Sequence, residues 1–167
     1  GFRYDGDRYS VLSQVVTAVT SATWEDNLIS HVFGPAQMTS TFTFNLDPAG
    51  RKTLVAKPYF HEGDKVIAGR FLTQVNAAVG LQSSVADMLK FLQACLSRDL
   101  ASGEAYETMF SPTLLRTNIP VNYGLGWFIE ESRGQKVIWH NGYGLAASGL
   151  IILLPEKDLA FVLLGNS

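Results

Sequence analysis

The sequence KVIWHNGYGLAASGLIILLPEKDLAFVLL, residues 136–164, decides the fold class of this 167-residue chain. It contains apolar or aromatic runs of strand length at 136–140, 149–154 and 159–164. PEKD at 155–158 has the length and residue types of a hairpin turn, so the strands on either side of it are predicted to be antiparallel. Because the last two runs are continuously hydrophobic, we expect helices to cover both faces of the sheet.

A further strand is predicted just upstream. YGLGWFI at 123–129 is apolar and aromatic, and ESRG at 131–134 has the residue types of a second hairpin turn. Residues 120–167 are therefore predicted to be antiparallel sheet strands.

Residues 1–119 are predicted to be mainly helical. The first helix is expected over 7–20, with Asp7 as its N-cap, because apolar residues recur there at helical spacing. These residues are Val11, Leu12, Val15, Val16 and Val19.

Three more helices are expected in this part of the chain. The second begins near Thr23, with Thr23 or Ser21 as its N-cap, and ends at GP, residues 34–35. The third follows the capping sequence SSVAD at 83–87, and a short fourth starts at 103–109.

A long irregular excursion is predicted at about 39–70, where Thr, Lys, Gly and Pro are frequent and only TFTF at 41–44 alternates like a strand. Such excursions often form pocket walls. Helices followed by an antiparallel sheet give an α+β fold class. The chain is predicted to be one partial domain, residues 1–167, because both ends of the sequence look cut.

Composition and charge exclude several functions. The formal net charge is -2 and no run of like charges occurs, so nucleic acid is not an expected partner. The apolar runs are far shorter than the roughly 20 residues that span a bilayer, so no membrane span is predicted. Cys95 is the single cysteine, which excludes a disulfide framework; it is expected in the core. None of this fixes the compartment.

No metal or cofactor is predicted. His31, His61 and His140 do not have the spacing of metal ligands, and GLG at 124–126 lacks the third glycine of a dinucleotide loop. No phosphate-binding loop, Gly-x-Ser-x-Gly elbow or Ser-x-x-Lys motif occurs. These residues therefore contain no motif that identifies a catalytic nucleophile.

The candidate site residues are few. His140 ends a predicted strand and is followed by Asn141, Gly142 and, two residues later, Gly144, whose backbone could approach a substrate carbonyl. The alternative is a simple glycine-rich turn. Tyr4 is a weaker candidate, because a tyrosine near a chain end is most often a packed ring with a solvated hydroxyl.

Taken together, five blocks of the sequence resemble the C-terminal half of the serine β-lactamase and penicillin-binding-protein family, in its class C and esterase-like branch. Their order matches that of the family, and they extend over nearly the whole chain. The blocks are FRYDGDRYSVL at 2–12, FGPAQMTST at 33–41, AAVGLQSSVADM at 77–88, YGLGW at 123–127 and HNG at 140–142.

The resemblance implies acyl transfer through a serine. Tyr4 matches the family's proton-shuttling tyrosine, and His140 matches the basic residue that opens the Lys/His-x-Gly motif. Tyr143 would offer its backbone N–H to the oxyanion. Asn141, Gly142 and Gly144 would line the substrate. A cationic neighbour, His140 or a lysine outside this sequence, would be needed to lower the pKa of Tyr4.

Two departures from the family pattern bear on activity. Gly6 stands where the family has asparagine in its Tyr-x-Asn block, which makes β-lactamase action less expected than esterase, transferase or peptidase chemistry. The Ser-x-x-Lys block should lie upstream of Tyr4, outside these residues.

The predicted function is therefore the C-terminal portion of a serine hydrolase or acyltransferase that acts on β-lactams, esters or D-amino-acid peptides and amides. The alternative is a catalytically inactive family fragment that serves as a binding or interaction module. Without the upstream part, this piece is expected to expose a sheet edge and an apolar face. The expected partners are an acyl substrate and either the upstream half of the same protein or a second copy, bound at that surface.

Overall fold

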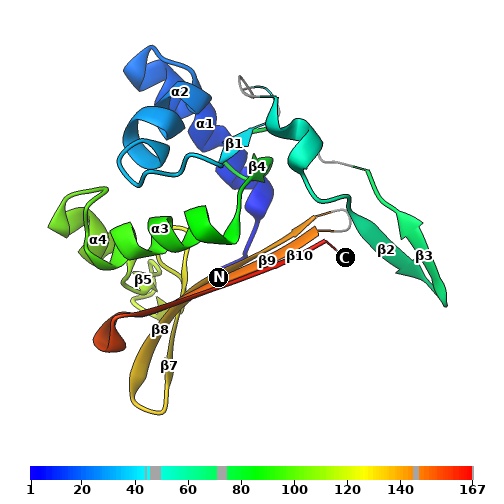
Figure 1. The fold of residues 1–167 in the computed structure, drawn as a ribbon. Helices are drawn as coiled ribbons and strands as arrows, with labels where there is room; N and C mark the ends of the chain where they lie inside the picture. Colours follow the sequence, from blue (N-terminus) through cyan, green and yellow to red (C-terminus); the bar gives the residue numbers. More distant parts are fainter. Residues whose placement is uncertain (44, 46–49, 71–74, 145–146, 167) are drawn as a thin grey trace.

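The computed structural model of the chain describes residues 1–43, 45, 50–70, 75–144 and 147–166. Its main sheet has four antiparallel strands in the spatial order β10-β9-β8-β7 (Figure 1). These strands are β7 Phe128–Ser132, β8 Gln135–Gly144, β9 Ala147–Leu154 and β10 Leu159–Gly165. Together with the helices they confirm the predicted α+β class.

Both predicted hairpins are present. Ser132 pairs with Gln135 across Arg133 and Gly134, whose φ angles of 54° and 72° place both central residues in the left-handed region. A two-residue turn in this conformation has a backbone twist that matches the right-handed twist of the flanking strands. The second hairpin joins β9 to β10 through a short 3-10 turn at Pro155–Lys157.

The strand predicted at 123–129 is only partly correct. β7 begins at Phe128, whereas 123–127 forms a tight turn in which the Gly124 N–H donates to the Trp127 carbonyl oxygen at 2.8 Å. Gly126 has φ 85°, a conformation that β-branched and bulky residues avoid. The glycines therefore turn the chain before the strand begins.

Among the described residues, four α-helices lie in the first two thirds of the chain. They are α1 Gly6–Thr20, α2 Trp24–Leu28, which continues as a π-helical turn over Ile29–Phe33, α3 Val85–Leu96 and α4 Gly103–Met109. Thr23 caps α2 and Ser84 caps α3 by accepting a backbone N–H. Asp7 is not the N-cap of α1 as predicted, because the extended residue Asp5 precedes the first turn, and the Asp5 side chain makes no capping bond.

The stretch at 39–70 is more regular than its composition predicts. β1 Phe42–Thr43 confirms the extended segment at those two residues and pairs with β4 Leu81–Gln82, whereas Phe44 lies outside the described residues. After a 3-10 helix at Arg51–Leu54, β2 Tyr59–Glu62 and β3 Lys65–Ala68 form a hairpin that projects from the rest of the chain (Figure 1). A last small pair joins β5 Thr113–Leu114 to β6 Pro120–Val121.

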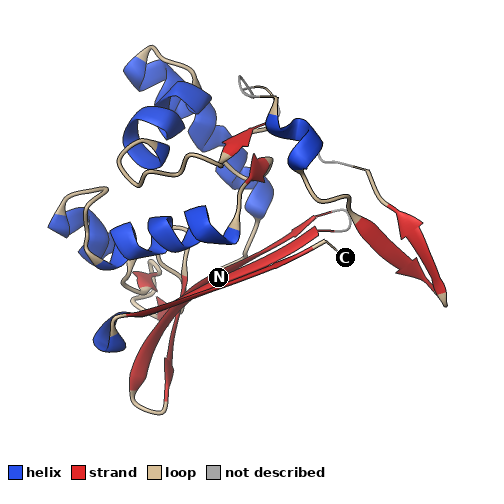
Figure 2. Cartoon of the chain, in the orientation of Figure 1, coloured by secondary structure: helices blue, strands red, loops and turns tan. Residues whose placement is uncertain are grey.

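The main hydrophobic cluster lies between α3, α4 and one face of the main sheet. Figure 2 shows both helices on the same side of that sheet. Cys95 is 3% exposed there, as predicted. Burial raises the pKa of its thiol to about 12, so the thiol stays protonated and is a poor nucleophile. The buried residues of this cluster are Leu92, Cys95, Tyr106, Phe110, Trp127, Ile138 and Leu153.

The opposite face of the sheet is open in the described residues. The prediction that helices cover both faces is therefore wrong for this piece, whereas the predicted exposed apolar face is present. In β10, Ala160 and Val162 pack against the core, while Leu159, Phe161 and Leu163 are exposed by 46%, 46% and 59%. The strand alternates sides although its sequence is continuously apolar. Several exposed apolar side chains on one face of a strand are a feature of interaction surfaces.

Asp87 on α3 joins the helices to the segment before β1. Its carboxylate is almost completely buried and accepts hydrogen bonds from the Ser40 N–H at 2.6 Å, the Thr41 hydroxyl at 2.9 Å and the Lys90 ammonium at 3.0 Å. Burial acts to raise the pKa of Asp87, but the bonds from Lys90, Thr41 and Ser40 outweigh it and hold the pKa below its usual value. The carboxylate therefore stabilises this junction in its ionised form.

Candidate active site

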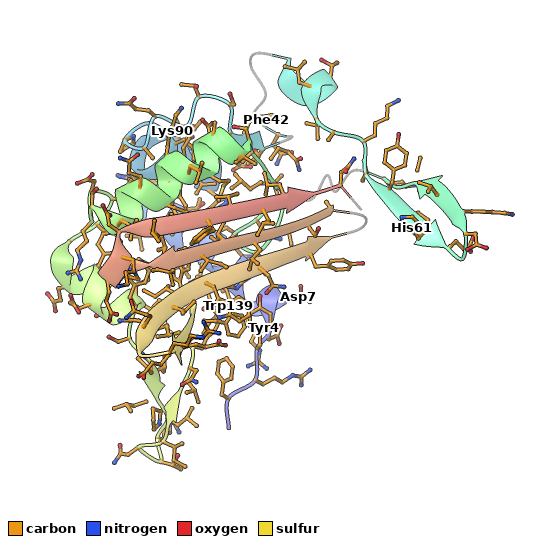
Figure 3. The ribbon with its side chains drawn as sticks, turned by 60° about the horizontal axis from the view of Figure 1, so that its bottom comes forward. Tyr4, Asp7, Phe42, His61, Lys90 and Trp139 are labelled. Atoms are coloured by element: carbon orange, nitrogen blue, oxygen red, sulfur yellow. The ribbon has the colours of Figure 1, made fainter. Side chains whose placement is uncertain are left out.

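Tyr4 and His140, 136 residues apart in the sequence, come together at the β8 side of the main sheet. The Tyr4 hydroxyl lies 3.4 Å from Nε2 of His140. Phe128 stacks on the Tyr4 ring, with 5.7 Å between centroids, and on the Trp139 ring at 4.5 Å. Figure 3 shows Tyr4 and Trp139 next to β8, with β9 and β10 beyond it. Aromatic packing thus holds the Tyr4 ring against the strand that carries His140.

The end of β8 offers an open backbone edge. β7 pairs with β8 as far as Trp139, whereas residues 140–144 pair only with β9 among the described strands. Asn141, Gly142 and Tyr143 are exposed, and the Tyr143 side chain is 84% exposed. Edge backbone groups of this kind are free to hydrogen-bond an extended ligand.

Tyr123 belongs to the same cluster, although the sequence analysis did not select it. Its hydroxyl lies 3.4 Å from the same His140 Nε2, and the residue is only 5% exposed. Trp127, four residues later, is buried in the core. The turn at 123–127 therefore begins at Tyr123 and ends at a residue that the core holds in place. The sequence signal that could have identified it is a hydroxyl-bearing aromatic residue directly before a glycine turn.

Burial sets the protonation states of the cluster. Desolvation lowers the pKa of His140, and a hydrogen bond with the Asn141 backbone only partly opposes this. A lowered pKa favours the neutral imidazole at pH 7, so of the two cationic neighbours predicted for Tyr4, His140 or a lysine outside this sequence, His140 is the less suited at that pH. Burial raises the pKa of Tyr123, and the neighbouring Tyr9 and Tyr4 hydroxyls add to the effect. Tyr123 therefore keeps its proton.

A cavity of about 240 Å³ lies beside Tyr4 and Tyr123. Arg3 and Arg8 also line it, and Arg8 forms an ion pair with Asp5 at 3.0 Å. A larger, mainly apolar cavity of about 470 Å³ lies between α2 and β1, but none of the predicted site residues lines it. The smaller cavity is therefore the one that belongs to the Tyr4 cluster.

Two negative findings concern the described part of the chain. It holds no group of three His, Cys, Asp or Glu side chains that could bind a metal ion. None of its helices is both long and apolar enough to cross a membrane.

Comparison with known proteins assigns the family. The beta-lactamase family model matches residues 1–167, the whole chain. The chain belongs to the beta-lactamase family. The predicted resemblance to serine β-lactamases and penicillin-binding proteins is thereby confirmed.

Relatives within the beta-lactamase family include penicillin-binding proteins. The provisionally named penicillin-binding protein PbpX of Bacillus subtilis (strain 168) is 31% identical over 131 residues, which cover 75% of this chain and 31% of that protein. The octameric penicillin-binding protein homologue from Pyrococcus abyssi has a TM-score of 0.85 and 26% identity, covering 100% of this chain and 39% of its own.

An amidase shares the fold. D-amino acid amidase from Ochrobactrum anthropi SV3 has a TM-score of 0.80 and 22% identity, covering 100% of this chain and 51% of its own. The beta-lactamase-family sequence described here thus spans about half or less of the length of these relatives.

Proposed function

We propose that this chain supplies the proton-transfer and substrate-binding part of a serine hydrolase or acyltransferase. The acyl-serine would form on a Ser, assisted by a Lys, that both lie upstream of these 167 residues. The observation that carries the proposal is the 3.4 Å approach of the Tyr4 hydroxyl to His140 Nε2 across the fold. Membership of the beta-lactamase family supports it.

In this proposal Tyr4 moves the proton between the serine hydroxyl and the leaving group. The neutral His140 accepts a hydrogen bond from a tyrosine hydroxyl at Nε2. At the open edge of β8, the Tyr143 backbone N–H donates to the oxyanion, and Asn141, Gly142 and Gly144 contact the acyl group. A methyl group at Gly142 would meet no atom within 4 Å, so this edge leaves room for a substrate.

The proposed substrates are β-lactams, esters and D-amino-acid peptides or amides, with β-lactams the least favoured. Gly6 is the reason, because a Cβ at this position would lie 3.6 Å from the Tyr4 hydroxyl. An asparagine at position 6 would therefore place its amide in the site, and glycine leaves that space empty. The fold shared with a D-amino acid amidase supports an amide substrate.

The test is covalent trapping in the full-length protein. Incubation with an activated ester, a D-amino-acid amide or a β-lactam should add the acyl mass to one serine upstream of Tyr4. Tyr4→Phe should slow acylation by about 10²–10⁴-fold, the usual contribution of a general acid or base. Tyr59→Phe, on the projecting hairpin, is the matched control and should acylate at the normal rate. Absence of any adduct with all three substrate classes would rule the proposal out.

The second candidate is an inactive family member that acts as a binding module. Gly6 favours it, because glycine stands where the family has asparagine. An intact Ser-x-x-Lys motif upstream in the full-length sequence would argue strongly against it.

Either candidate leaves the open sheet face to be covered by the upstream part of the protein or by a second copy. The octameric state of the Pyrococcus homologue makes self-association a reasonable expectation. Native mass spectrometry should show a monomer if the upstream part covers the face, and an oligomer if copies cover one another.

A further inference from the structure

Two tyrosine hydroxyls compete for one nitrogen in the site. Tyr4 and Tyr123 each place a hydroxyl oxygen 3.4 Å from His140 Nε2. The Asn141 backbone interacts with the ring so as to raise its pKa, which is the effect of an acceptor on a ring N–H. We assign that contact and the ring proton to the other nitrogen, Nδ1, because two hydroxyl oxygens already lie near Nε2. In the neutral ring Nε2 then has a single lone pair to share between the two hydroxyls.

Burial distinguishes the two competitors. Tyr4 is 46% exposed, so water can satisfy its hydroxyl, whereas Tyr123 is 5% exposed and needs a protein acceptor. Leaving a buried hydroxyl unpaired would disfavour that arrangement on the order of tenfold in population or more. The lone pair is therefore better used by Tyr123 than by Tyr4.

The turn at 123–127 makes Tyr123 suited to this task. The Leu125 N–H bonds the Met109 carbonyl oxygen at 3.1 Å, and Trp127 packs against Phe110 and Phe91 in the core. The backbone under Tyr123 is thus fixed on both sides. Tyr4, by contrast, lies before α1, in a segment whose residues 1–4 are all exposed.

We propose that Tyr123 is a positioning residue that holds His140 Nε2 in the resting site and thereby leaves the Tyr4 hydroxyl available to the substrate side. The inference rests on the proposed function, because it assigns Tyr4 to proton transfer. Tyr9 is the other candidate acceptor for the Tyr123 proton, since its hydroxyl also interacts with Tyr123. If the Tyr123 hydroxyl donated to Tyr9 instead, His140 Nε2 would accept its hydrogen bond from the Tyr4 hydroxyl.

The experiment measures the hydrogen bond at Nε2 directly. The imidazole nitrogens of the full-length protein, labelled with ¹⁵N-histidine, are observed above pH 7 in long-range ¹H–¹⁵N spectra. Tyr123→Phe should move the His140 Nε2 resonance towards the position of an unbonded acceptor nitrogen. Tyr4→Phe should leave it in place. Tyr106→Phe, which removes a buried core hydroxyl that bonds the Ala94 carbonyl, is the matched control and should also leave it in place.

Two results would overturn the inference: movement in Tyr4→Phe with none in Tyr123→Phe, or movement in neither. If Tyr123→Phe does not fold, Tyr4→Phe decides alone. A resonance that is unmoved and lies at the position of a hydrogen-bonded acceptor nitrogen then supports Tyr123, because these two are the hydroxyls that the described residues place within bonding distance of Nε2; one that lies at the position of an unbonded nitrogen refutes the inference. A moved resonance refutes it. The NMR measurement uses no substrate. It can therefore refute the role of Tyr123 while acylation of the serine still occurs, and it can support that role when no acylation is found.

Discussion

The glycines of the turn at 123–127 offer a quantitative test of how the site is built. In Gly124→Ala the new methyl would overlap the Met109 carbonyl oxygen and lie 2.9 Å from Ile129 Cδ1 and 3.0 Å from the Ser111 carbonyl oxygen. Two of these three atoms belong to the backbone, which cannot rotate away. Overpacking costs about 1–3 kcal/mol, and weakening the Leu125 bond to Met109 adds about 1 kcal/mol. We expect Gly124→Ala to lose about 2–4 kcal/mol of unfolding free energy.

Two matched glycine substitutions separate crowding from backbone conformation. Gly126→Ala meets no atom within 4 Å but has φ 85°, so it should lose about 1–2 kcal/mol. Gly142→Ala has open space and no positive φ, so it should stay within about 0.5 kcal/mol of the parent. Urea unfolding followed by tryptophan fluorescence gives all three values, because Trp127 is buried beside the turn. The reasoning is refuted if Gly124→Ala is as stable as Gly142→Ala.

Further predictions concern three ionisable groups that folding removes wholly or partly from solvent, Asp87, His140 and Cys95. Asp87→Ala should lower the free energy of unfolding by about 3 kcal/mol, because the Ser40 N–H and the Thr41 hydroxyl lose the carboxylate that accepts their hydrogen bonds. Asp5→Ala, at an exposed ion pair, should lower it by less than about 1 kcal/mol in the same urea assay. Folding lowers the pKa of Asp87, so the contribution of its carboxylate to the free energy of unfolding is complete above the unfolded pKa, near pH 4, and is lost as the pH falls through the folded pKa. Asp87→Asn should remove that part of the acid-unfolding curve. The pKa of His140 is also lowered, so between that pKa and about 6.5 the unfolded chain binds more protons and stability should decrease as the pH falls, a slope that His140→Gln should remove. The Cys95 thiol, with a pKa of about 12, should resist iodoacetamide at pH 8 in the native protein and react once urea unfolds it, which mass spectrometry can follow.

Local patterns predicted the elements whose signals lie within a few residues. The caps at Thr23 and Ser84, the turns at 131–134 and 155–158, and the apolar runs of β8, β9 and β10 all depend on neighbouring residues. Because it reads only neighbouring residues, the pattern also predicted a strand over 123–129, although β7 begins at Phe128. The apolar content of this stretch is typical of a strand, but the Gly124 contact with Met109 involves a residue from another element.

The sequence by itself also determined the family, because ordered motifs carry it, and it predicted Tyr4 and His140 as site residues, which the structure places 3.4 Å apart. Only the tertiary structure placed Tyr123 at His140 and showed the partial burial of the ring that lowers its pKa. It also left one face of β10 open despite its continuous hydrophobicity. The reason is that burial, and with it charge state and hydrogen-bond competition, depends on atoms brought together from distant segments. No local pattern in the chain records those contacts.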